Sequence, residues 1–290
     1  AITYAVTDAG TTGCTVDSAN RTISFTATGS CEVSATAAAN DQYQSVSTSA
    51  TFVITKADQT ITITDPGAQT YALGGTFSIS GTASSGLTVA FGSTTPSVCT
   101  VAGTTVTTVS AGTCTITADQ AGNGSYNAAP QASIDVTINK AATTVTWSPT
   151  NTSVLTTDSP VTPNASPTVS TGGGAVSYSI SDAGGSGCTV DSSSGVISFT
   201  TSGTCQVTAT AAETANFASG STTVSFAISK ATQTITFGSL TNQAFGTGPY
   251  AISGSTDATG LVLSFSTTTP TVCSVTGGTS LVGGNTPAAV

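Results

Sequence analysis

The groups with the clearest chemistry in this chain are seven cysteines, six of which fall into three pairs. The pairs have separations of 17, 15 and 17 residues and are Cys14–Cys31, Cys99–Cys114 and Cys188–Cys205. Disulfides are favoured over a metal site, because the chain has no histidine and no Cys-x-x-Cys motif. We therefore predict three disulfides, each worth about 3 kcal/mol in the chain-entropy description, and an oxidising compartment outside the cytoplasm.

Four aspartates recur in matching positions and could ligate a cation. They are Asp8, Asp17, Asp182 and Asp191. Carboxylates of this kind could hold calcium between domains, although calcium takes six to eight oxygen ligands. The alternative is that each carboxylate closes its own turn by accepting backbone N–H groups. These aspartates are the calcium candidates, and we expect no other metal and no cofactor.

Three of the four basic residues occupy equivalent places, each in a Lys-Ala pair after a strand that ends in isoleucine. They are Lys56, Lys140 and Lys230. We expect them to mark domain junctions. Their amines could donate isopeptide bonds, as in some surface adhesins, or they could be solvated side chains at the junctions.

No catalytic set is found among the remaining residues. Histidine, the commonest general base, is absent, so none of the many serines has a base beside it. Only 6% of the 290 residues are charged, whereas 63 are Thr and 41 are Ser. The net charge of −9 argues against nucleic acid and anionic membranes as partners. No apolar run is long enough to insert in a membrane. We expect a protein that is not an enzyme.

The elements that position these groups are short β-strands. Apolar and polar residues alternate in 60–64, 113–117, 134–138, 196–199 and 224–228. Such alternation predicts half-buried strands, and clusters of Gly, Ser, Asp, Asn and Pro separate them. Thr on the outward faces keeps the strands wettable without charge. No apolar pattern of helical period and length is present, so the fold class is all-β.

An internal repeat organises the whole chain. Residues 1–59 match residues 175–233 at an offset of 174, and Pro96-Ser-Val-Cys99 matches Pro270-Thr-Val-Cys273. Within this period the Lys-Ala pairs open two related units of 84 and 90 residues. An aromatic residue follows the second cysteine of each pair by twelve positions, at Tyr43, Tyr126 and Phe217. Fixed spacing of this kind indicates one structural template used several times.

We accordingly divide the chain into four repeats of two alternating types. The first repeat (1–55) is the C-terminal part of a type-1 unit, and the second (56–139) is a complete type-2 unit. The third repeat (140–229) is a type-1 unit with a Pro-rich insertion, expected as an irregular edge strand with a long loop. The fourth (230–290) is the N-terminal part of a type-2 unit. Units of this size with many short strands predict tandem immunoglobulin-like Greek-key sandwiches arranged as a rod.

The motifs of the second repeat resemble those of bacterial immunoglobulin-like tandem repeats. They are Lys56-Ala-Asp-Gln-Thr-Ile-Thr62, Gly86-Leu-Thr-Val89, Thr95-Pro-Ser-Val-Cys99, Ala111-Gly-Thr-Cys114-Thr-Ile-Thr-Ala118 and Asn123-Gly-Ser-Tyr126-Asn-Ala-Ala129. Such repeats occur in large secreted surface proteins, in the stalks of adhesins and in extracellular fibres. The resemblance implies a secreted or cell-surface protein, but such a fold hosts many functions.

Cys273 is the counterpart of Cys99, yet the counterpart of Cys114 is not found after it. One interpretation is that the chain is part of a longer polypeptide. The other is that copies of the chain complete each other head to tail, with Cys273 as a candidate for an inter-subunit bond. Contacts of that heterologous kind build open filaments.

Two functions of different classes remain open at this point. The first is structural: a disulfide-stapled repeat protein that forms an extracellular bacterial filament or a surface stalk. The second is an adhesin repeat region whose loops bind a surface glycan or a host protein.

Overall fold

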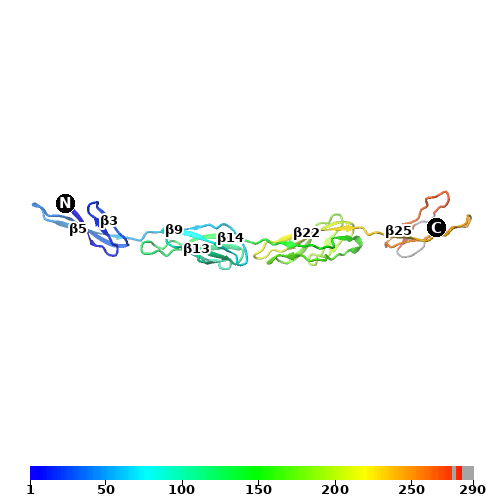
Figure 1. Ribbon diagram of the computed structural model, residues 1–290, viewed down its shortest axis with the longest axis horizontal. Helices are drawn as coiled ribbons and strands as arrows, with labels where there is room; N and C mark the ends of the chain where they lie inside the picture. Colours follow the sequence, from blue (N-terminus) through cyan, green and yellow to red (C-terminus); the bar gives the residue numbers. More distant parts are fainter. Residues whose placement is uncertain (248, 276–278, 283–290) are drawn as a thin grey trace. The chain divides into compact units, whose positions relative to one another are not determined.

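The computed structural model describes residues 1–247, 249–275 and 279–282. Within them the regular structure is β-strand apart from one short 3-10 helix, η1 (Thr156–Asp158). The chain divides into two compact units. The first comprises Ala1–Thr146, Thr168–Val176 and Thr210–Ser221, and the second comprises Trp147–Pro167, Ser177–Ala209 and Thr222–Val290. Figure 1 follows the strands in chain order by colour.

The second repeat shows the sandwich in full. In one layer β6 pairs with β9, and β8 pairs with β12, which pairs with β11. These strands are β6 (Ile61–Thr64), β8 (Thr76–Ser78), β9 (Ser80–Ala83), β11 (Cys99–Ala102) and β12 (Thr105–Thr108). The other layer has the order β10-β13-β14-β7. Its strands are β7 (Gln69–Thr70), β10 (Ala90–Ser93), β13 (Gly112–Asp119) and β14 (Ala132–Asn139).

This strand order is that of an immunoglobulin-like sandwich. Only Ile79 separates β8 from β9, so the two act as one second strand lying between the first strand, β6, and β12. The first layer therefore has the order A-B-E-D and the second has C-F-G, as in immunoglobulin domains. All pairings are antiparallel except that of β7 with β14, which is parallel. The prediction of an all-β immunoglobulin-like fold is confirmed.

Alternation along the strands builds the core between the two layers. In β13 and β14 the residues Cys114, Ile116, Val136 and Ile138 turn inward, while Thr and Asp alternate with them on the outer face. The buried cluster consists of Tyr71, Ile79, Cys99, Val106, Cys114, Ile116, Val136 and Ile138. Burial of such side chains contributes about 25 cal/mol per Å² of apolar surface, which is the main stabilising term. The period-two pattern in the sequence is therefore the pattern of the core.

The third repeat has the same plan. Its four-stranded sheet has the order β16-β22-β21-β18, with β16 parallel to β22, and its two-stranded sheets are β15-β17 and β19-β20. The strands are β15 (Val145–Thr146), β16 (Ser153–Leu155), β17 (Thr168–Val169), β18 (Val176–Asp182), β19 (Thr189–Val190), β20 (Ile197–Ser198), β21 (Gly203–Ala211) and β22 (Gly220–Ser229). Trp147 is a core residue, with its ring centroid 5.5 Å from that of Tyr178 and 6.1 Å from that of Phe226. Its indole N–H donates to the carbonyl oxygen of Ala165.

The first repeat forms a sheet of order β1-β4-β5 and a hairpin, β2-β3. The strands are β1 (Ile2–Asp8), β2 (Thr15–Asp17), β3 (Thr22–Ser24), β4 (Gly29–Ala37) and β5 (Val46–Ile54). Here Ile23 is 40% exposed, whereas its counterpart in the third repeat, Ile197, is 1% exposed. In the third repeat the backbone of Val161 bridges to Ile197 and covers it.

The fourth repeat contains two pairs of antiparallel strands, β23-β24 and β25-β26. They are β23 (Ile235–Phe237), β24 (Gly254–Thr256), β25 (Leu261–Ser264) and β26 (Thr279–Val282). Phe237 packs edge-to-face against Phe265, with ring centroids 5.7 Å apart. Part of the sequence expected in this repeat, residues 248, 276–278 and 283–290, lies outside the described residues.

Candidate functional site at the repeat junctions

The structure contains the three disulfides expected from the cysteine spacing. Their Cα–Cα distances are 6.3, 5.6 and 6.1 Å for Cys14–Cys31, Cys99–Cys114 and Cys188–Cys205. In each case the bridge ties the beginning of a short hairpin to the central strand of a sheet, namely β4, β13 or β21. All six sulfur-bearing residues are buried. The bridges therefore staple the two layers of each sandwich together.

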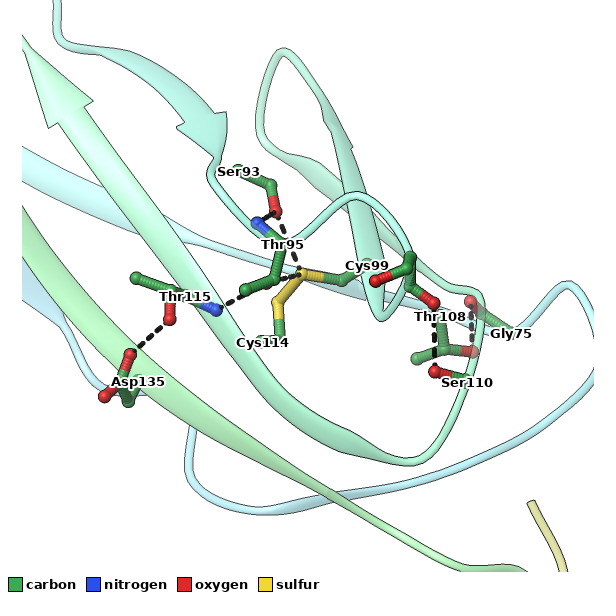
Figure 2. The surroundings of a disulfide bond; sticks show 10 residues. Gly75, Ser93, Thr95, Cys99, Thr108, Ser110, Cys114, Thr115 and Asp135 are labelled. Carbon is green, nitrogen blue, oxygen red and sulfur yellow. Dashed lines mark hydrogen bonds between the residues drawn. A yellow bond between two sulfur atoms is a disulfide. The ribbon is translucent and has the colours of Figure 1, made fainter. Parts of the chain in front are cut away.

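Hydroxyl groups surround the Cys99–Cys114 bridge, as Figure 2 shows. The Cys99 Sγ lies 3.3 Å from the Ser93 Oγ and 3.8 Å from the Thr95 Oγ1. The Thr95 hydroxyl also accepts the backbone N–H of Thr115, at 2.9 Å. Thr115 in turn donates its hydroxyl to the Asp135 carboxylate, at 2.6 Å. This series of hydrogen bonds thus links the disulfide to the neighbouring strand β14 through Thr side chains.

Cys273 lies in the same hydroxyl environment without the disulfide. Thr267 and Thr269 take the places of Ser93 and Thr95, with their hydroxyl oxygens 3.2 and 3.8 Å from the Cys273 Sγ. The thiol is exposed and is not paired with any of the other six cysteines. Hydrogen bonds from Thr267 and then Thr269 lower the pKa of this thiol. Its role as an inter-subunit link remains a prediction.

The four aspartates proposed as calcium ligands each accept hydrogen bonds within their own turn. Asp8 accepts the N–H of Gly10, and Asp182 accepts the N–H of Gly184. Asp17 accepts two backbone N–H groups and the Asn20 amide, and the Asn20 bonds hold the pKa of Asp17 below its usual value. Asp191 is bonded by Ser193 and Ser194 in the same way, which lowers its pKa further. Among the described residues, no three His, Cys, Asp or Glu side chains are grouped for a metal ion.

Each of the first two junction lysines precedes an alanine whose backbone is locked to a loop. The Ala57 N–H donates to the Ser125 carbonyl at 2.9 Å, and its own carbonyl accepts the N–H of Asn127 at 2.8 Å. Ala141 makes the same two bonds with Asn216 and Ala218, at 2.9 and 2.8 Å. The linker that opens a repeat is therefore bridged to a loop of that same repeat.

Lysine side chains contribute little to these junctions. The Lys140 Nζ lies 3.3 Å from the Glu213 carboxylate, in an ion pair that is largely exposed and so worth about 1 kcal/mol or less. Lys230 follows the same Lys-Ala pattern, but Ala231 carries no such bridge within the described part of the chain. The isopeptide alternative gains no support from this geometry.

The loop that receives the linker has one conformation in three repeats. Its four residues are 40–43, 123–126 and 214–217, and the last of them is always aromatic. In the first two loops the side-chain oxygen of the leading Asn accepts the backbone N–H groups two and three residues later. In the third loop the Thr214 hydroxyl accepts the Phe217 N–H. Each loop is thus a side-chain-closed turn that presents its aromatic ring. We call it the junction loop.

Within the first compact unit, the junction loop of the third repeat contacts the end of the second repeat. Phe217 packs edge-to-face against Tyr71, with ring centroids 5.8 Å apart and planes at 82°. Tyr71 is only 7% exposed and belongs to the core of the second repeat. Beside this pair, the Asn216 side-chain oxygen accepts the backbone N–H of Ala111 at 2.9 Å. The Phe217 ring and the Asn216 side chain therefore cover the end of the second sandwich.

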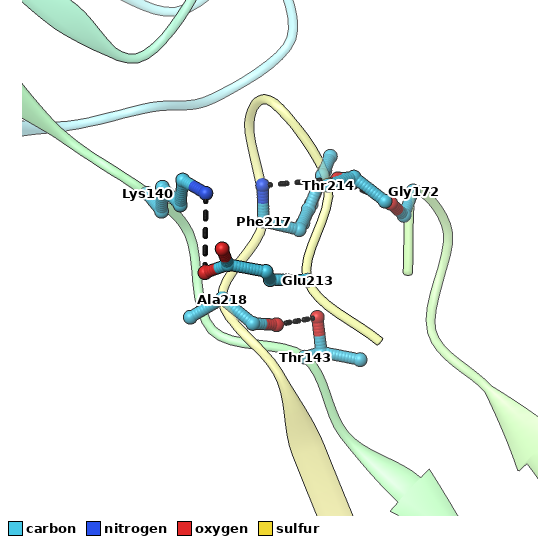
Figure 3. A network of polar contacts seen from close by, with 7 residues as sticks. All are labelled: Lys140, Thr143, Gly172, Glu213, Thr214, Phe217 and Ala218. Atoms are coloured by element: carbon cyan, nitrogen blue, oxygen red, sulfur yellow. Dashed lines mark hydrogen bonds and ion pairs between the residues drawn. The ribbon is translucent and has the colours of Figure 1, made fainter. Parts of the chain in front are cut away.

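The backbone behind the junction loop is packed closely, as Figure 3 shows around Lys140, Thr143 and Gly172. The Thr143 hydroxyl donates to the Ala218 carbonyl, and the Thr214 hydroxyl donates to the Gly172 carbonyl at 3.0 Å. A Cβ added at Gly172 would overlap the ring of Phe217. The φ of Gly172 is also +90°, so this position requires glycine for two reasons. Gly172 thereby lies directly against the Phe217 ring.

A second junction of the same kind joins the first and second repeats, again inside the first compact unit. Tyr126 lines a shallow groove together with Phe25 and Ile54 of the first repeat. The Gly124 carbonyl in this junction loop accepts the Thr28 hydroxyl at 3.1 Å. A junction loop thus contacts the preceding repeat in both cases, through the Phe217 ring in one and the Gly124 carbonyl in the other.

Sequence analysis identified the spacing of these aromatic residues but not their role. The partners Tyr71 and Phe217 are 146 residues apart, and no local pattern marks them as a pair. Asn216 and Gly172 were not identified at all. The one available signal was that the aromatic residue and the polar residue three positions before it recur together.

No protein-family model and no curated protein sequence matches this chain. Among solved structures it is similar to Drosophila N-cadherin EC1-3, at 11% identity and a TM-score of 0.28 over 79% of this chain and 89% of that one. It is also similar to mouse cadherin-23 EC22-24, at 15% identity and a TM-score of 0.30 over 79% and 86%. A third similar structure is the C-terminal 282-residue fragment of intimin, solved in complex with the intimin-binding domain of the translocated intimin receptor. It has 13% identity and a TM-score of 0.24 over 72% of this chain and 60% of that one.

Identities and TM-scores at this level carry no inference about function, so the fold assignment depends on the strand order described above. The three disulfides fit an oxidising compartment outside the cytoplasm. In the part of the chain that the structure describes, no helix has the length and apolar character needed to cross a bilayer.

Proposed function

We propose that this protein is a structural array of immunoglobulin-like repeats that forms a secreted or cell-surface stalk or filament of bacterial type. Its function in this proposal is to span distance and transmit tension, and successive repeats are held by their junction loops. The observation that carries the proposal is that a junction loop contacts the preceding repeat twice: the Phe217 ring packs against Tyr71, and the Gly124 carbonyl beside Tyr126 accepts the Thr28 hydroxyl.

The junction distinguishes such an array from a series of domains joined by flexible linkers. Domains joined by free linkers move independently by default. At the junction of the second and third repeats, bending would have to separate the Phe217 ring from Tyr71 and break the bond between Asn216 and Ala111. Composition favours the same role, because a surface of Thr and Ser needs few ion pairs and offers few cleavage sites for proteases that require charged residues.

Trypsin provides a direct test, since it cleaves only after Lys and Arg. The four such residues are Arg21, Lys56, Lys140 and Lys230. Cleavage requires local opening of the backbone. We therefore expect native full-length chain to be cut after Lys230 well before it is cut after Lys56 or Lys140. The fragments can be identified by mass spectrometry.

The variant Phe217→Ala sharpens this test. Removing the ring from a half-buried contact should make opening easier by about 1.5–3 kcal/mol, and so raise cleavage after Lys140 roughly tenfold or more, with Lys56 unchanged. Tyr43→Ala is the matched control, because Tyr43 holds the same place in a junction loop but is 73% exposed. Equal cleavage after Lys140 and Lys230 in the unmodified chain would remove the support for a restrained array.

A further inference from the structure

The two aromatic residues of the internal junction each have an unpartnered counterpart in the same chain. Phe217 corresponds to Tyr43 in the first repeat, and Tyr71 corresponds to Phe245 in the fourth, both at the offset of 174. The flanking residues agree, since Gln69-Thr-Tyr71 matches Gln243-Ala-Phe245. The chain therefore carries the Tyr71–Phe217 contact once as a pair and once as two separate halves.

Both separate halves are open to solvent. Phe245 is fully exposed and Tyr43 is 73% exposed, whereas Tyr71 is 7% exposed and Phe217 is partly buried. A large aromatic side chain that stays in water lacks the apolar contacts that a partner could provide. No described residue of the chain supplies that partner.

The Tyr43 half is already in the conformation that the contact needs. Asn40 Oδ1 accepts the N–H groups of Gln42 and Tyr43 at 3.0 and 2.8 Å, and the Asn40 N–H donates to the Tyr43 carbonyl. The loop of the third repeat has the corresponding N–H to carbonyl bond, from Thr214 to Phe217. Binding at Tyr43 would therefore require little rearrangement of the loop backbone.

We propose that Phe245 of one copy of this chain packs against Tyr43 of a second copy, and so reproduces between chains the Tyr71–Phe217 junction. This names the partner in the proposed array and rests on that proposed function. The two halves are different surfaces on one chain, so the contact is heterologous. Each copy offers one of each, and such contacts continue into an open chain of copies rather than closing as a dimer.

The contact between copies should be weaker than the junction inside the chain, because only the internal junction has a covalent linker. Inside the chain, the covalent linker supplies an effective concentration on the order of mM. Between copies that advantage is absent, so we expect association only at high protein concentration. Salt should strengthen it, because each copy carries a net charge of −9 and the repulsion is screened.

Sedimentation velocity on the full chain tests the proposal, with Cys273→Ser throughout so that disulfide exchange cannot link copies. We expect the weight-average mass to rise with concentration without a fixed limit. Tyr43→Ala and Phe245→Ala should each weaken association about tenfold or more. Leu240→Ala is the matched control, since Leu240 is an exposed apolar residue of the fourth repeat with no counterpart in the junction pair.

Mixing the two variants decides whether the contact is head to tail. The Tyr43→Ala chain keeps a functional Phe245, and the Phe245→Ala chain keeps a functional Tyr43. An equimolar mixture should therefore form dimers and nothing larger. A chain that stays monomeric at every concentration overturns the proposal, as does association that neither variant weakens or a mixture that grows beyond dimers. Tryptic protection at Lys140 is unaffected by any of these results, so a failure here is separate from a failure of the proposed array.

Discussion

At the scale of single residues, the hydroxyl groups of Thr and Ser make many of the side-chain hydrogen bonds in this protein. Thr115 joins the disulfide region to Asp135, and Thr143 and Thr214 hold the backbone around the junction loop. Thr146 pairs with Thr168 across two strands in the same way. Apart from the Asp135 carboxylate, the groups in these bonds are neutral, so each neutral bond contributes about 1 kcal/mol that depends little on pH or salt. A chain with only 6% charged residues can be held together in this manner.

Cys273 is the residue whose chemistry is most open to measurement. Because hydrogen bonds from Thr267 and Thr269 lower its pKa, a larger fraction is thiolate at neutral pH, and the thiolate is the reactive form. We expect Cys273 to react with iodoacetamide at lower pH than a free cysteine peptide, as followed by mass spectrometry. Thr267→Val should move the reaction midpoint back up. A midpoint at or above that of the peptide would contradict the assignment.

At the scale of the element, the strands follow directly from local alternation. Residues 60–64 and 134–138 were predicted as strands, and they form β6 and β14. Prediction is possible there because a strand with one buried face must alternate, whatever lies elsewhere in the chain. The junction is different. Phe217 meets Tyr71 only where a loop of one sandwich docks on the other, so no local period encodes the contact.

Gly172 gives a prediction at the scale of the junction loop. Gly172→Ala places a methyl group in the space of the Phe217 ring at a φ of +90°. We expect it to displace the ring and lower the stability of the third repeat by about 1–3 kcal/mol, measured by urea unfolding.

A matched control for Gly172 lies in the same repeat. Gly185 has a φ of +77° and nothing within 4 Å of an added Cβ. Gly185→Ala therefore carries the backbone strain without the clash. If both variants lose the same amount of stability, the ring contact has no part in the effect of Gly172→Ala.

Considered as a whole molecule, the protein has very few ion pairs in its described residues, and the one that links Lys140 to Glu213 is exposed. We therefore expect its thermal transitions to depend only weakly on salt. Raising NaCl from about 0.02 to 0.5 M should move each midpoint by less than about 4 °C in calorimetry. Any movement should be upward, since screening relieves the repulsion of a net charge of −9. A large downward shift would show that ion pairs contribute more than the structure indicates.

The disulfides have a consequence for a chain that is pulled from its ends. Each bridge closes a loop of 15 or 17 residues, so those residues cannot lengthen while the sulfur–sulfur bond is intact. At about 3.3–3.6 Å per residue, every loop withholds roughly 50–60 Å of contour. Under oxidising conditions an unfolding repeat would therefore lengthen by less than its full sequence allows. A reducing environment would allow the residues inside each loop to extend, so the redox state of the surroundings would set how far the chain can stretch before it breaks.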